Sequence, residues 1–113
     1  MAGNRNDKTD LLRGTLALLI LQTLDLGNLH GIAIADRIRQ LTHGTFDVKA
    51  GSLFPALHRL EQEGWIAGQW TVTDDGRRIK SYAMTASGRK QLSAEKRQWD
   101  RIVVAVSQVL SAG

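Results

Sequence analysis

The first apolar segment of the chain is hydrophobic on all of its sides. We expect a helix over Leu11–Leu24, with Asp10 as its N-terminal cap. Its central stretch, Leu16–Leu21, contains only apolar residues, so the helix has no polar face to turn toward solvent. A domain of 113 residues cannot easily surround one of its own helices. The pattern therefore predicts that a second subunit covers this helix.

The next two apolar patterns also have the period of a helix. A second helix is predicted over Gly31–Leu41, followed by an extended link over Phe46–Lys49. A third helix is predicted to start at Ser52, as its N-cap, and to end at Gly64. Pro55 then falls in the first turn. The backbone N–H groups of that turn have no acceptor within the helix, so the N–H that proline lacks costs no hydrogen bond.

The period changes to that of strands after the third helix. Trp65–Thr73 and Arg77–Met84 are rich in aromatic and β-branched residues and flank a turn signature at Asp74–Gly76. Thr85 can then cap a last helix, from Ala86 to about Leu110. Its apolar residues have a three-four spacing that forms a seam for another helix: Leu92, Trp99, Ile102, Val103, Val106, Val109 and Leu110.

The order helix, helix, helix, hairpin, helix is that of a winged helix-turn-helix. We expect a mainly α fold with a two-stranded β-wing and a C-terminal dimerisation helix. The expected parts are a flexible N-terminal segment (residues 1–9), a DNA-binding domain (residues 10–85) and the dimerisation helix (residues 86–113). The expected interface of the homodimer comprises Leu16, Leu19, Ile20, Trp99, Ile102, Val103, Val106, Val109 and Leu110.

Composition and charge narrow the function classes. A formal charge of +4 favours an anionic partner, and the absence of cysteine excludes disulfides and thiolate chemistry. His30, His43 and His58 lack metal-ligand spacing, and no phosphate-binding loop or nucleophile motif occurs. We therefore expect no enzyme activity, no metal and no cofactor. The apolar runs are too short for a bilayer and no signal peptide is recognisable, so we expect a cytoplasmic protein without membrane contact.

The polar face of the third helix is the candidate surface for reading DNA. With Leu53, Leu57 and Leu60 pointing inward, the opposite face presents Ser52, Pro55, His58, Arg59 and Gln62. Arg59 can form two hydrogen bonds to guanine in the major groove, and Ser52 or His58 can reach a base edge or a phosphate. The alternative is that this face is only the solvated side of an amphipathic helix.

The hairpin supplies a second candidate contact with DNA. Three cations lie close together in sequence, namely Arg77, Arg78 and Lys80. Long cationic side chains on a wing can enter a minor groove or bind phosphates. The alternative is a solvated turn in which Asp74 and Asp75 neutralise the arginines. Lys49, just before the third helix, is a further candidate for a phosphate contact.

Several of these segments resemble the PadR family of transcriptional regulators. The resembling segments are Leu12–Thr15, Leu29–Gly31, Gly51–Glu61, Glu63–Ile66, Arg77–Tyr82 and Met84–Arg89. The resemblance implies a repressor that binds a pseudo-palindromic site on double-stranded DNA as a homodimer. The single helix after the wing is similar to the short subfamily, which dimerises through that helix and the first one. The family usually has Tyr where Phe54 stands, so a hydroxyl that could reach a phosphate is missing here.

The resemblance also implies a place for a small aromatic effector. In some short members a Trp near the position of Trp99 lines a pore between subunits and stacks on flat aromatic compounds. The alternative is that Trp99 only packs the dimer interface. Two other classes of protein stay open. A winged helix that only docks proteins predicts an apolar or acidic third helix, and an RNA-binding protein needs exposed aromatic platforms.

Overall fold

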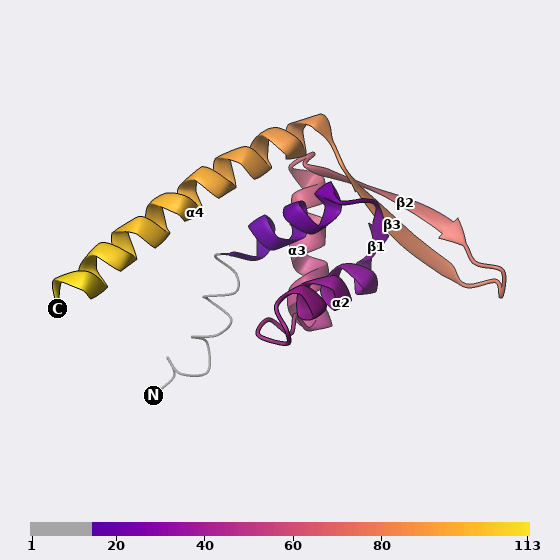
Figure 1. The fold of residues 1–113 in the computed structure, drawn as a ribbon. Coiled ribbons are helices and arrows are strands. Elements are labelled where there is room, and N and C mark those ends of the chain that lie inside the picture. Colours follow the sequence, from indigo (N-terminus) through magenta and orange to yellow (C-terminus); the bar gives the residue numbers. More distant parts are fainter. Residues whose placement is uncertain (1–14) are drawn as a thin grey trace.

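The elements of the computed structural model follow the predicted order, and the fold is a mainly helical winged helix (Figure 1). The structure describes residues 15–113, so the predicted cap Asp10, the helix start at Leu11 and the flexible segment 1–9 lie outside the described residues. The first helix is described over residues 15–25. It is followed by β1 (Leu29–His30), α2 (Gly31–Leu41), α3 (Ala50–Gln62), β2 (Ile66–Val72), β3 (Arg78–Met84) and α4 (Ala86–Ala112).

The wing has a third strand that the sequence did not predict. In the described part of the chain the sheet has the order β1-β3-β2 and both pairings are antiparallel. Leu29 pairs with Tyr82, and the hairpin register runs from Ile66 opposite Met84 to Val72 opposite Arg78. A strand of two residues is too short to show an alternating pattern, so only its pairing with β3 defines it.

The start of α3 differs from the prediction. Lys49, in an extended conformation, is the N-cap, so the expectation that Ser52 caps this helix is wrong. Ser52 donates its backbone N–H to the Lys49 carbonyl at 3.0 Å and lies inside the first turn. Pro55 consequently lies in the second turn, where it removes the hydrogen bond that the Gly51 carbonyl would accept. The buried Val48 anchors the preceding link, which lets the helix begin directly after Lys49.

The first helix lies in the core of its own protomer. Its buried residues belong to one cluster with residues of the other helices and the sheet: Leu16, Ile20, Leu21, Leu24, Ile34, Ile38, Val48, Leu53, Ala56, Leu57, Leu60, Ile66, Tyr82 and Leu92. Leu16 is 3% exposed and Ile20 is 0% exposed. Their assignment to the dimer interface is therefore corrected, because both side chains are already buried in the core of the protomer.

The start of α4 is fixed by Thr85, as predicted. The Thr85 hydroxyl accepts the Gly88 N–H at 3.0 Å and donates to the Gly64 carbonyl at 2.6 Å. The Thr85 N–H also donates to the Trp65 carbonyl at 3.1 Å. From this joint α4 extends away from the rest of the molecule, and all its residues from Lys96 onward are exposed (Figure 1). The helix ends at Ala112, slightly beyond the predicted end.

Two glycine substitutions are predicted to act in opposite directions. A Cβ at Gly88 would overlap the Trp65 carbonyl oxygen, which is backbone and cannot move aside. Gly88→Ala should therefore lower the free energy of unfolding by about 1–3 kcal/mol. Gly51→Ala is the matched control, because that helical position has open space and should gain about 0.5–1 kcal/mol. Urea unfolding at equal protomer concentration measures both, and a shift in the same direction would contradict the prediction.

Candidate nucleic-acid interface

One face of α3 is exposed along the whole helix. Pro55, His58 and Arg59 lie on this face, whereas Ser52 is half-buried at its edge. Leu53, Leu57 and Leu60 on the opposite face are fully buried, as predicted. Within α3, all of which is described, no exposed residue is acidic. Neither His58 nor Arg59 forms an ion pair or a side-chain hydrogen bond with another residue of the described range 15–113. The donors of both side chains are therefore available to a ligand.

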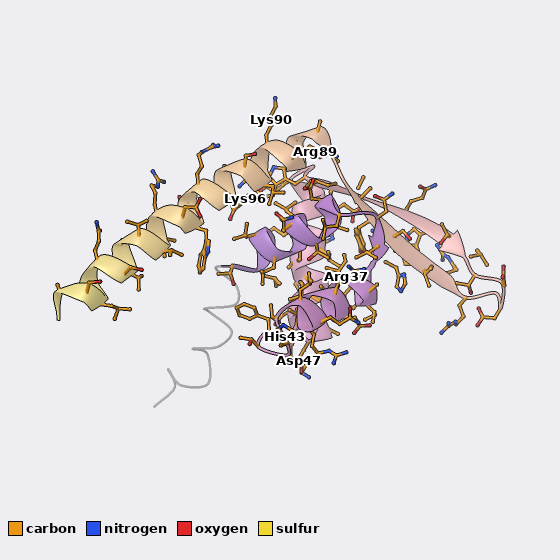
Figure 2. The ribbon with its side chains drawn as sticks, viewed as in Figure 1. Arg37, His43, Asp47, Arg89, Lys90 and Lys96 are labelled. Atoms are coloured by element: carbon orange, nitrogen blue, oxygen red, sulfur yellow. The ribbon has the colours of Figure 1, made fainter. Side chains whose placement is uncertain are left out.

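The cation that precedes α3 already has an anionic partner. The ammonium nitrogen of Lys49 lies 2.6 Å from Asp47 Oδ2, and both side chains are largely exposed. This hydrogen bond lowers the pKa of Asp47 below its ordinary value. Figure 2 shows Asp47 near His43, at the end of the molecule where α3 begins. A phosphate at Lys49 would have to compete with this carboxylate.

Arg77 at the wing tip is also paired. Its Nε lies 3.1 Å from Asp75 Oδ2 in a turn that is open to solvent. Asp75 in addition accepts a hydrogen bond from the Thr73 hydroxyl, which is the main cause of the lowered pKa of Asp75. The alternative stated above was that acidic residues of the turn neutralise the arginines. In the free protein, Arg77 is paired in this way with Asp75.

Lys80 is a link between the wing and α3, which the sequence did not predict. Its ammonium nitrogen lies 2.9 Å from Glu61 Oε1, and the side chain is only 25% exposed. The hydrogen bond to Glu61 raises the pKa of Lys80 above its ordinary value. The ammonium group also lies 5.7 Å from the centre of the Trp70 ring and 5.5 Å from that of Tyr82. The description of Lys80 as a projecting wing cation is therefore corrected.

Arg78 has an aromatic partner instead of a carboxylate. Its guanidinium carbon lies 4.7 Å from the centre of the Trp70 ring, a distance typical of cation–π contacts. No acidic side chain pairs with Arg78 among residues 15–113. Sequence reasoning did not single out Trp70. Its closeness to Arg78 follows from the hairpin register. That register places Trp70 opposite Lys80 and Val72 opposite Arg78, on one face of the hairpin.

The seam predicted on α4 is an exposed apolar surface from Trp99 onward. Leu92, which was predicted to belong to it, is 4% exposed and lies in the core of the protomer. Trp99 is 42% exposed, and its neighbours along the seam are exposed to a similar or greater extent. These residues are Ile102, Val103, Val106, Val109 and Leu110. An apolar stripe of this length on a projecting helix indicates a surface that a partner covers. Of the interface residues predicted on the first helix, Leu19 is only half-buried. It therefore still has surface that a partner could cover.

Residues 15–113 contain no cluster of histidine or acidic side chains placed to hold a metal ion. Among the helices described in this range, none is sufficiently long and apolar to cross a membrane.

Known proteins share both the sequence pattern and this fold. The model of the PadR-like family of transcriptional regulators matches residues 20–94. A transcriptional regulator of Mycobacterium tuberculosis is 31% identical over 90 residues, which cover 80% of each chain. A PadR family regulator from Eggerthella lenta is 27% identical, with a TM-score of 0.80 over 96% of this chain and 93% of that one. A PadR-like regulator from Bacillus cereus is 28% identical, with a TM-score of 0.75 over 89% of this chain and 96% of that one. The chain belongs to the PadR-like family of transcriptional regulators.

Proposed function

We propose that the protein is a repressor that binds a pseudo-palindromic DNA operator as a homodimer. The observation that carries this proposal is the exposed face of α3, where no acidic residue of the helix is exposed and neither His58 nor Arg59 has a side-chain partner among residues 15–113. A recognition helix of this kind enters the major groove, where arginine reads guanine through two hydrogen bonds. Ser52 and Pro55 lie toward the N-terminal end of the same helix. Lys49 and the wing cations Arg77 and Arg78 provide contacts to the DNA backbone.

The homodimer is supported by the uncovered seam of α4. A helical segment of four turns that is solvated on every side has only marginal stability by itself. Helices in proteins gain most of their stability by packing an apolar face against other elements. A second copy supplies such a face. In this arrangement the chain up to Thr85 is the DNA-binding domain and α4 is the dimerisation helix. The interface comprises Leu19, Trp99, Ile102, Val103, Val106, Val109 and Leu110.

Response to a small aromatic effector is the third part of the proposal. Trp99 lies on the seam of α4, where two subunits would meet, and part of its ring surface is free in the protomer. An indole face between subunits can stack on a planar compound. Gln98 and Asp100 flank Trp99 and can pair with a hydroxyl or cationic group of such a ligand.

The first test concerns the recognition helix. The operator is located by footprinting the DNA upstream of the protein's own gene. Arg59→Ala should then weaken binding to the operator by roughly 1–3 kcal/mol and affect a scrambled duplex much less. Lys90→Ala is the matched control, because Lys90 projects from α4 on the side away from the beginning of α3 (Figure 2). Equal losses of affinity for both duplexes would mean that Arg59 contacts the DNA backbone instead of a base. If footprinting found no protected site, the proposed DNA-binding function would be contradicted.

The second test separates two faces of α4. Val106→Asp would bury an unpaired carboxylate in the seam, at a cost of roughly 3–5 kcal/mol, and should shift the protein to monomers at micromolar concentration. Val104→Asp is the control, because Val104 is 56% exposed, against 50% for Val106, but lies about 160° away around the helix. Sedimentation velocity reports both states. A dimer that survives Val106→Asp, or a wild-type monomer, would contradict the interface.

The third test isolates Trp99 by fluorescence. In a Trp65→Phe, Trp70→Phe variant, planar aromatic cations that release the protein from its operator should also quench Trp99 emission. Trp99→Leu should abolish that release without weakening DNA binding. If effective compounds leave the emission unchanged and still act on Trp99→Leu, then Trp99 only packs the interface.

A further inference from the structure

A notch is lined by residues of α3, of both hairpin strands, of β1 and of the beginning of α2. Its volume is about 400 Å³. The lining residues are His30, Gly31, Ile32, Phe54, Trp70, Arg78, Ile79, Lys80 and Tyr82. None of these lining residues, all from the described part of the chain, is acidic. The notch therefore combines aromatic and aliphatic walls with a positive rim.

Two aromatic rings from different elements line the notch. Phe54 comes from α3 and lies against Gly31, where an added Cβ would stand 2.9 Å from the ring. Trp70 comes from β2. Phe54 is 43% exposed and Trp70 is 55% exposed, although both rings are large and apolar. Exposed apolar surface gathered in a concave place indicates a site that a ligand covers.

Arg78 provides the charge that is available in this notch. Lys80 also lines it, but Glu61 balances the ammonium group at 2.9 Å. Arg78 has no such carboxylate among residues 15–113, and its guanidinium carbon lies 4.7 Å from the centre of the Trp70 ring. Stacking holds a guanidinium by its face and leaves its N–H edge free, which is the part that binds phosphate oxygens. The side chain is thus oriented before any ligand arrives, which reduces the entropy lost on binding.

We propose that this notch binds one sugar–phosphate unit of the DNA backbone. Arg78 pairs with the phosphate, and the exposed rings of Phe54 and Trp70 pack against the deoxyribose. Trp70 is also the positioning residue for Arg78. The inference rests on the proposed function and adds a site to it. DNA is the occupant because the notch separates α3 from the wing, so a duplex that lies on both elements must pass across it.

The test replaces single phosphates of the footprinted operator duplex by neutral methylphosphonates. At one linkage in each half-site the replacement should weaken wild-type binding by about tenfold. Arg78→Ala and Trp70→Leu should bind the unmodified duplex more weakly and lose sensitivity at that linkage alone. Trp70→Phe keeps a ring face and should keep most of the sensitivity. Lys90→Ala should behave as the wild type at every linkage.

Salt titration gives a second measurement that does not depend on Trp70 variants folding. Arg78→Ala alters an exposed side chain and should reduce the slope of log affinity against log salt by about two units per dimer. Arg77→Ala should change the slope less, because Asp75 pairs with Arg77 in the free protein. If Arg77→Ala reduced this slope more than Arg78→Ala does, the assignment of Arg78 to the phosphate would be overturned.

The outcomes distinguish the notch from the proposed function. If the wild type protects an operator but Arg78→Ala and Trp70→Leu keep full sensitivity at every linkage, the notch does not bind the backbone and the function stands. If the wild type binds no duplex even at about 50 mM salt, both the function and the notch are overturned.

Discussion

The joint between Gly64 and Gly88 is the constraint on which the other parts of the molecule depend. The end of α3, both bases of the hairpin and the start of α4 all meet there. Gly64, with a φ of 79°, lets the chain leave α3, and its carbonyl accepts the Thr85 hydroxyl. The Trp65 carbonyl accepts the Thr85 N–H, and the missing side chain at Gly88 lets α4 approach this carbonyl. A few short contacts therefore set the direction of α3, the wing and α4 relative to one another.

A second link fixes the hairpin farther from this joint. Lys80 and Glu61 join β3 to the last turn of α3, and the absence of a side chain at Gly68 leaves room for the lysine stem. A partly buried pair of this kind contributes more to orientation than an exposed pair, because fewer water molecules compete for its groups. The wing therefore uses one cation to hold its position. Arg78 has no carboxylate partner among residues 15–113, whereas Arg77 is paired with Asp75 within the turn.

The long helix α4 contrasts with the rest of the protomer. Up to Leu92 it contributes to the core, and beyond Lys96 every residue is exposed. A helix whose second half carries an apolar stripe without cover gains most of its stability from a partner. In the proposed dimer, the distance between the two recognition helices then depends on two rigid connections: the seam between subunits and the joint at Thr85. A ligand at Trp99 would act on the first of these connections.

The sequence by itself determined the order and type of the elements. The apolar spacing predicted α2, α3 and the seam of α4, Thr85 marked the start of α4, and Asp74–Gly76 marked the hairpin turn. These features depend on residues within one or two turns of each other, so local periodicity and capping reveal them.

Only the tertiary structure decided which groups meet across the molecule. It paired β1 with β3, moved the start of α3 to Ala50 and enclosed Leu16 and Ile20 in the protomer. It also joined Lys80 to Glu61, 19 positions away, and brought Phe54 and Trp70 into the lining of one notch. Charge and hydrophobicity are properties of single residues, but whether a lysine is free or paired depends on the group that the fold brings beside it. No local pattern in the sequence contains that information.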